Sequence, residues 1–338
     1  MNISSNNHWG DLKEIIVGRA DFATVPPSDP SMRNFMYANL TYRELSKYVG
    51  SYSDRVIFEA NEDLEILSEK LKEFNVIVHR PKKIRHDAPI ITPYWKTTGW
   101  HNYCPRDIFL IIDNCIVEVP SVMRSRIFES WSYNDILHNA FDDGARWFSA
   151  PKQMYKDDSF DFNDLSKPTL MNDEILFDAP NIVRLDNDLL YQVSNSGNLK
   201  GAKWLQSMFP GHTVHIEKDS YSGAHFDSTV VPLREGLVLL NGHRCNEKNY
   251  PKIFKNWQKI FFTDFESNEM KSSGISSDAI GMNLLSINEK LVIIDEKQKS
   301  LIKTLKQYGV ESCPLPMRQS RTLGGGFHCV TLDLRRGE

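Results

Sequence analysis

The chain has 338 residues, of which 41% are hydrophobic and 25% charged, as is typical of a globular protein. Its net charge of −4 and the lack of a basic cluster argue against nucleic acid as a partner. We recognise no signal peptide, no apolar stretch of the roughly 20 residues that a membrane span needs, and no metal-ligand spacing among the five cysteines. We therefore expect a cytoplasmic protein without structural disulfides, a metal site or a membrane contact.

A unit made of a helix, an aromatic residue, a tight turn and a short strand recurs along the chain. In the first copy, leucines on one face predict a helix over residues 64–74, before the strand-like residues 76–78. Gly309 follows the last helix, at the position where glycine often ends a helix. The four later copies occupy residues 135–148, 202–216, 251–262 and 299–313.

Hairpin-like pairs of apolar runs lie between these units, at residues 107–119, 181–193, 229–240 and 283–294. A fifth hairpin forms if residues 12–18 pair with residues 330–334, near the other end of the chain. That pairing would close five ββαβ units into a ring. From the pattern alone, the alternative is a generic α/β chain in which such alternation arises by chance.

The domain organisation follows from the absence of a Gly/Ser-rich linker, which predicts a single domain over residues 1–338. The polar segment 156–174 is expected to form an excursion or lid. Residues 270–277 are expected to form a second mobile loop.

Polar residues stand at the start of several hairpins. In a ring, equivalent starting points face one axis, so residues far apart in sequence would meet in a central pocket. These residues are Asp107, Asp178, His225, Asp227 and Cys329.

Cys329 follows three glycines in LGGGFHCV, a loop that permits close approach of a ligand, so its thiol is a candidate nucleophile. A buried cysteine that packs as a small hydrophobe is the alternative.

The adjacent His328 would point to the opposite face of a strand, so we expect it to be structural. His225 is the better proton partner, and Asp178 can orient it by accepting its second N–H. A backbone-bonded histidine and a turn aspartate are the alternatives.

Asp107 and Asp227 add two carboxylates. Paired carboxylates suit acid–base glycoside chemistry, but they also suit a planar guanidinium, which offers donors in a fixed fork. Structural salt bridges with Arg106, Arg124 or Arg126 are the alternative for Asp107.

The chain as a whole resembles the arginine:glycine and inosamine-phosphate amidinotransferases, from about Trp9 to Arg336. The resemblance implies a five-fold pseudosymmetric α/β propeller of ββαβ modules, of the pentein type. It also implies a homodimer that needs no metal or organic cofactor. The segments that carry it are HWGDLKEIIVGRAD, TTGWHNYCPRDIFLIIDNCIVEVPSVMRSRIFE, GARWFSAPK, FDAPNIV, AHFDSTVVPL and LGGGFHCVTLDLRR, with YCPRD and GGGFHC the most specific blocks.

By resemblance, Cys329 is the nucleophile, His225 the acid–base and Asp178 its partner. Asp107 and Asp227 correspond to the carboxylates that hold the guanidinium. The partners implied are L-arginine and a small amine acceptor, and the reaction would transfer the amidino group through a covalent amidino-cysteine and release L-ornithine. Two alternatives remain: a hydrolase of the arginine deiminase type with water as the acceptor, and a non-catalytic arginine-binding protein.

Two arginines, and two positions that differ from the glycine-type enzymes, bear on which substrates the protein takes. Arg244 matches a residue that binds a substrate carboxylate in the glycine-type enzymes, and Arg126 a substrate-site arginine of the inosamine-phosphate type. Ala224 replaces a methionine and Gly281 a serine of the glycine-type enzymes. We expect these smaller side chains to admit an amine bulkier than glycine, so glycine, an aminocyclitol phosphate and a natural-product amine all remain open as acceptors.

Overall fold

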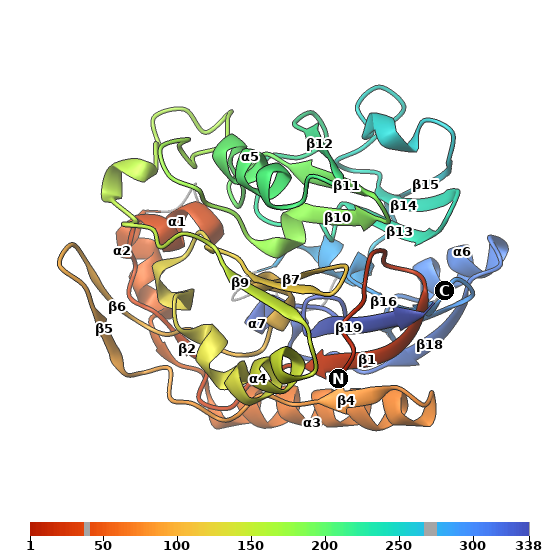
Figure 1. Cartoon of the computed structure of the whole chain (residues 1–338), viewed down its shortest axis with the longest axis horizontal. Coiled ribbons are helices and arrows are strands. Elements are labelled where there is room, and N and C mark those ends of the chain that lie inside the picture. The colour runs from red at the N-terminus through yellow and green to blue at the C-terminus, as the bar shows by residue number, and fades with distance from the viewer. Residues whose placement is uncertain (37–40, 267–275, 338) are drawn as a thin grey trace.

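The computed structural model describes residues 1–36, 41–266 and 276–337, so most of the segment 270–277 lies outside the described residues. The described part forms five three-stranded sheets arranged in a ring (Figure 1). In each sheet the first two strands pair antiparallel, and the third strand pairs in parallel with one of them. Two small hairpins, β2–β3 and β5–β6, stand apart from these sheets.

The strands of each sheet have the following bounds. The five sheets are β19, β1 and β4 (Thr331–Gly337, Asp11–Val17, Ile77–His79); β7, β8 and β9 (Phe109–Ile112, Cys115–Glu118, Arg146–Ser149); β10, β11 and β12 (Ile182–Leu185, Asp188–Gln192, Thr213–Glu217); β13, β14 and β15 (Val230–Arg234, Leu237–Asn241, Gln258–Phe262); and β16, β17 and β18 (Leu285–Asn288, Leu291–Asp295, Glu311–Leu315). The two small hairpins are β2 and β3 (Thr24–Val25, Gly50–Ser51) and β5 and β6 (Pro89–Ile91, Lys96–Thr98).

The helices in the described residues connect these strands. The α-helices are α1 to α7 (Pro30–Met36, Tyr42–Leu45, Asp54–Glu73, Asn134–Asp142, Leu199–Met208, Lys299–Gln307, Ser320–Leu323). The 3-10 helices are η1 to η8 (Ser46–Tyr48, Pro105–Asp107, Arg124–Arg126, Glu129–Tyr133, Asp157–Ser159, Ala179–Asn181, Lys252–Phe254, Asp278–Met282). None of these helices combines the length and the apolarity needed to cross a membrane.

The ring closes where β1 meets β19. The two strands pair antiparallel with Ile15 opposite Asp333 and Val17 opposite Thr331, as the sequence predicted for residues 12–18 and 330–334. The first and last strands of the chain therefore share one sheet. This closure confirms the predicted five-fold propeller of ββαβ modules.

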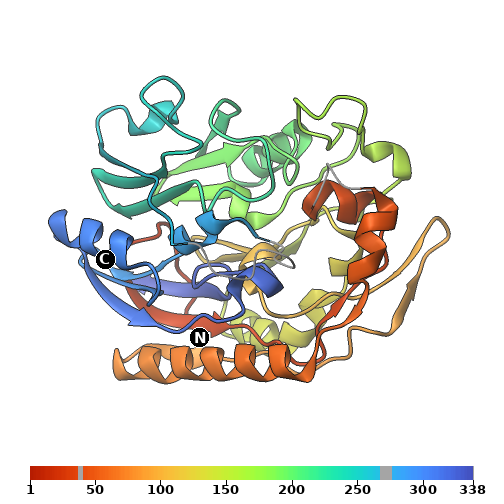
Figure 2. The ribbon, with the colours of Figure 1, turned by 180° about the vertical axis from the view of Figure 1, so that it is seen from behind.

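Four of the five predicted helices are present. In α3, Leu64, Leu67 and Leu71 are fully buried, and the helix runs along the outside of the ring (Figure 2). Gly309 follows α6 with a φ of 73°, a left-handed conformation in which glycine escapes the steric cost of a Cβ. The prediction of a helix within 251–262 is wrong. Between Pro251 and β15 there is room for less than two α-helical turns, and the chain forms only the 3-10 turn η7.

A buried ion cluster joins three modules. Asp333 in β19 pairs with Arg184 of β10 at 2.8 Å, with Arg336 at 2.6 Å and with Arg106 of η2. Its side chain is fully buried. Although burial favours the protonated carboxyl, the three guanidinium groups hold the pKa of Asp333 well below its ordinary value. Asp333 thus stays ionised and is the shared counter-charge of three buried arginines.

We expect Asp333→Asn to lower the free energy of unfolding by about 3–5 kcal/mol, because removing one partner leaves buried charges uncompensated. Denaturant unfolding followed by tryptophan fluorescence measures this change. The matched control is Asp11→Asn, at a half-exposed ion pair with Lys13, which should change stability by no more than about 0.5 kcal/mol. Equal stability of the two variants would show that the cluster does not hold the modules together.

Candidate active site

Each of the five modules contributes a polar residue from the start of its hairpin. Asp107 ends η2 before β7, Asp178 precedes η6 and β10, and His225 and Asp227 precede β13. Cys329 precedes β19. The structure brings these five predicted residues into one buried cluster.

Asn283, which lies between η8 and β16, completes the set from the fifth module. Its Oδ1 accepts the backbone N–H of Cys329 at 2.9 Å, and its backbone carbonyl accepts the N–H of His328 at 3.2 Å. Sequence reasoning missed this residue. The rule that selected the other five, a polar residue at a hairpin start, would also have found Asn283.

Cys329 is buried, and its Sγ donates a hydrogen bond to Asp227 Oδ2 at 3.2 Å. The glycines before it are required by packing. A Cβ on Gly325 would lie 2.5 Å from the Sγ of Cys104, and a Cβ on Gly326 would lie 2.7 Å from the Cβ of Asn283. The loop can therefore deliver the thiol to this position only with glycine at both places.

Burial raises the pKa of the Cys329 thiol well above its ordinary value, and the carboxylates of Asp227 and Asp107 add to the shift. The free protein therefore holds a thiol at neutral pH. A cation placed between the two carboxylates would lower this pKa and favour the thiolate.

His225 has a φ of 59°, an uncommon left-handed conformation for a residue with a side chain. Its backbone N–H donates to Ser196 Oγ at 2.8 Å, and its Nε2 lies 3.0 Å from Asp178 Oδ2. Asp178 is itself held by the N–H of Val122, at 3.1 Å from Oδ1. The imidazole is thus oriented by a carboxylate, as the sequence predicted.

Burial tends to lower the pKa of His225, but the carboxylates of Asp107 and Asp178 outweigh it and raise the pKa above the usual 6.5. Nδ1 of His225 lies 3.8 Å from Asp107 Oδ1. A raised pKa suits a group that gives a proton to a leaving amine near neutral pH.

One carboxylate oxygen of Asp107 accepts a hydrogen bond from a described residue and the other does not. Its Oδ2 accepts from Arg126 Nη1 at 2.6 Å, whereas Oδ1 is buried without a hydrogen bond from any described residue. Arg126 also donates to Glu129 at 2.9 Å and to the carbonyl of Cys104 at 3.2 Å. Arg126 is therefore held by protein groups and positions Asp107. A buried acceptor without a donor is costly unless a ligand supplies one.

Asp227 receives two hydrogen bonds on Oδ2, from the Cys329 thiol and from His328 Nδ1 at 2.8 Å. Burial acts to raise the pKa of Asp227, but the hydrogen bond from His328, together with the positive charge of His225 and the side-chain amide of Asn283, outweighs it, and the pKa falls below its ordinary value. The expectation that His328 points to the face opposite Cys329 is wrong, because residues 327–330 form a turn before β19 and both side chains reach the same oxygen of Asp227. His328 is not bonded to the thiol, however, and its contact is with the carboxylate.

Arg244, after β14, lies over the ring of Tyr221 at 3.9 Å from its centroid. Its guanidinium donates to Thr229 Oγ1 at 2.7 Å and to the hydroxyls of Ser228 and Ser277, each at 3.2 Å. No carboxylate among the described residues pairs with it. A cation with only neutral partners, beside the segment that carries Asp227, is suited to bind an anionic group.

Gly281 does not by itself widen the site. A Cβ at this position would lie 2.4 Å from Cδ of Gln298, so the side chain of Gln298 already fills that space. Ala224, directly before His225, is half-buried. Among the described residues, no group of three or more His, Cys, Asp and Glu side chains is arranged to hold a metal ion.

Comparison with known proteins identifies relatives over almost the whole chain, although no family model matches it. Inosamine-phosphate amidinotransferase 1 of Streptomyces griseus is 43% identical over 341 residues, which cover 99% of this chain and 97% of that protein. L-arginine:L-lysine amidinotransferase of Pseudomonas savastanoi pv. phaseolicola is 30% identical, with coverage of 99% and 94%. The solved structure of an inosamine-phosphate amidinotransferase from Streptomyces griseus has a TM-score of 0.96 and 42% identity, with coverage of 99% and 97%.

These relatives match the chain from end to end, and the solved structure has the same fold. The buried thiol, the oriented histidine and the carboxylates lie on segments within the matched length. The chain belongs to the amidinotransferase family and is a transferase of amidino groups.

Proposed function

We propose that this amidinotransferase takes the amidino group from L-arginine, holds it covalently on Cys329, and passes it to a primary amine with release of L-ornithine. The observation that carries the proposal is a buried thiol bonded to one carboxylate, with an oxygen of a second carboxylate in the same cluster that accepts no hydrogen bond from a described residue. A relative whose name includes L-arginine as a substrate supports the choice of donor.

Two carboxylates clamp the guanidinium in this proposal. The free Oδ1 of Asp107 accepts from one nitrogen, and Asp227 accepts from another, so the central carbon of the guanidinium lies against the thiol. Arg244 donates hydrogen bonds to the α-carboxylate of arginine, since it has no carboxylate partner within the described chain. The two ends of the substrate are thus recognised by charges of opposite sign.

The arriving cation offsets the carboxylates that keep Cys329 protonated. The thiol proton passes to His225, and the thiolate attacks the guanidinium carbon to give a neutral tetrahedral adduct. The imidazolium of His225 then protonates the departing amine, the C–N bond breaks, and ornithine leaves behind a positively charged S-amidino-cysteine (an isothiouronium cation) at Cys329. An acceptor amine attacks that carbon and gives its proton to His225. The C–S bond breaks and the thiolate returns.

The acceptor is a primary amine of one of three kinds: glycine, an aminocyclitol phosphate or a natural-product amine. Gln298 fills the space beside Gly281, so the replacement of serine by Gly281 gives no support to a bulkier acceptor. The replacement of methionine by Ala224 is the difference from the glycine-type enzymes that is left to test. The homodimer, the single domain and the cytoplasmic location expected from the sequence stay predictions.

The proposal is tested by incubating the protein with L-arginine, with and without candidate amines, and by measuring ornithine and citrulline. Wild type should release ornithine in proportion to the amine that is amidinated. Cys329→Ser should reduce the rate by roughly 10³-fold or more, because the nucleophile is lost. Cys313→Ser, at a half-buried thiol of β18, is the matched control and should keep its activity. Citrulline in place of an amidinated amine would establish the hydrolase, and tight arginine binding without product would establish the non-catalytic alternative.

Arg244→Gln should raise KM for L-arginine by roughly 10–100-fold, because a charged hydrogen bond to the substrate carboxylate is lost. Agmatine lacks that carboxylate, so it should be a poor donor for wild type and should be affected little by the substitution. Steady-state kinetics with both donors measures the ratio of their kcat/KM values. An unchanged preference for arginine over agmatine would refute the role of Arg244.

A further inference from the structure

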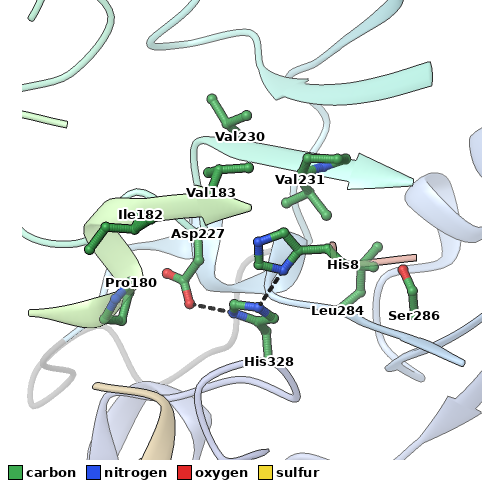
Figure 3. A pocket seen from close by; sticks show the side chains of 11 residues that line it. His8, Pro180, Ile182, Val183, Asp227, Val230, Val231, Leu284, Ser286 and His328 are labelled. Carbon is green, nitrogen blue, oxygen red and sulfur yellow. Dashed lines mark hydrogen bonds and ion pairs between the residues drawn. The ribbon is translucent and has the colours of Figure 1, made fainter. Parts of the chain in front are cut away.

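A chain of hydrogen bonds leads from Asp227 away from the thiol. His328 Nδ1 lies 2.8 Å from Asp227 Oδ2, and His328 Nε2 lies 3.2 Å from His8 Nδ1 (Figure 3). The other nitrogen of His8, Nε2, accepts the backbone N–H of Arg184 at 3.1 Å. Asp227, two imidazoles and one amide thus form a continuous series.

The amide at the end determines where every proton lies. A backbone N–H can only donate, so His8 Nε2 carries no proton and the proton of neutral His8 is on Nδ1. That proton is donated to His328 Nε2, which must therefore be an acceptor. His328 then carries its single proton on Nδ1 and donates it to Asp227. In this series of hydrogen bonds His328 cannot become an imidazolium. An imidazolium would carry a second N–H, on Nε2, and Nδ1 of His8, which faces it, already carries a proton and cannot accept it.

We propose that His8 is a positioning residue that keeps His328 neutral and in the Nδ1–H tautomer, so that Asp227 offers its full negative charge to the substrate cation. This inference rests on the proposed function, in which Asp227 binds the guanidinium. Within the described residues neither histidine is hydrogen-bonded to the thiol, and in this scheme both act through Asp227.

The two carboxylates that would hold the guanidinium, Asp107 and Asp227, then differ in whether their own partner is charged or neutral. Asp107 pairs with the permanent cation Arg126, whereas Asp227 is bonded to a neutral imidazole and a neutral thiol. The series of hydrogen bonds from Asp227 to His8 also cannot carry a proton away, because it ends at the backbone amide of Arg184, which does not release its proton. The proton of Cys329 therefore does not leave by this route, which leaves His225 to receive it.

The surroundings of the two histidines favour their neutral forms. Burial, followed by the Arg184 guanidinium, lowers the pKa of His8 well below 6.5, and burial together with Arg106 lowers the pKa of His328 to about 4. The carboxylates of Asp333 and Asp227 act in the opposite direction but do not prevail. The small cavity beside the pair is lined mainly by apolar side chains from β10, β13 and the start of β16 (Figure 3). A hydrogen bond is stronger in such surroundings than in water.

Nitrogen-15 NMR of histidine-labelled protein tests the protonation states directly and needs no enzymatic activity. We expect His8 and His328 to be neutral Nδ1–H tautomers from about pH 6 to pH 8. The variants His8→Gln and His328→Asn assign their signals. A wild-type His328 found as the Nε2–H tautomer, or as an imidazolium in this range, would overturn the proposal.

Kinetics of the same variants test the consequence for substrate binding. His8→Ala removes the donor to His328, which can then turn or become protonated, and KM for L-arginine should rise roughly 10-fold with a smaller change in kcat. His8→Gln, whose amide can both accept and donate, should restore most of this loss. The control is His215→Ala, at a partly exposed histidine paired with Asp188, which should behave as wild type.

Wild-type KM in a folded His8→Ala variant, as judged by its thermal unfolding, would contradict the role of His8. Failure of the wild type to release ornithine would instead contradict the proposed function, and the NMR measurement would still decide the protonation states.

Discussion

The pairing of β1 with β19 brings the two ends of the chain into one sheet, and the candidate site exists because of it. Cys329 lies in the turn that leads into β19, so its thiol reaches Asp227 and its backbone N–H reaches Asn283 only when that strand occupies its place in the ring. The same strand carries Asp333, which binds Arg106 and Arg184 of two other modules. Closure of the ring and assembly of the site therefore depend on the same strand, β19, and on its pairing with β1 at the other end of the described chain.

Within the ring, each carboxylate has a different partner and so a different electrostatic state. Asp107 is balanced by Arg126, Asp178 by the histidine that it orients, and Asp227 by two neutral donors. Burial then keeps the thiol protonated until a cation arrives. The free protein thus avoids an exposed thiolate, which is the form most open to oxidation, and the proposed substrate supplies the charge that activates its own nucleophile.

The four hairpins formed by neighbouring segments, and their order, follow from local patterns, because apolar alternation and turn residues are properties of short segments. The pattern left the closure of the ring open, and the resemblance to the amidinotransferases implied it. The hairpin-start rule selected Asp107, Asp178, His225, Asp227 and Cys329, which the structure brings together. The prediction of a helix within 251–262 was wrong because the pattern of apolar residues does not show where β15 begins, and too few residues lie between Pro251 and that strand for an α-helix of two turns. The hydrogen bond of Arg126 to Asp107 and that of His8 to His328 depend on tertiary geometry, and no local pattern indicates them.

The central claim is that the amidino group rests on one particular sulfur between donor and acceptor. It is tested most directly by mixing the protein with L-arginine labelled at the guanidinium carbon, without any acceptor, and mapping the quenched protein by peptide mass spectrometry. The account predicts a labelled adduct with the mass of one amidino group on the peptide that contains Cys329, which disappears when an acceptor amine is added. Ornithine release without label on Cys329, or a label on another residue, would contradict it.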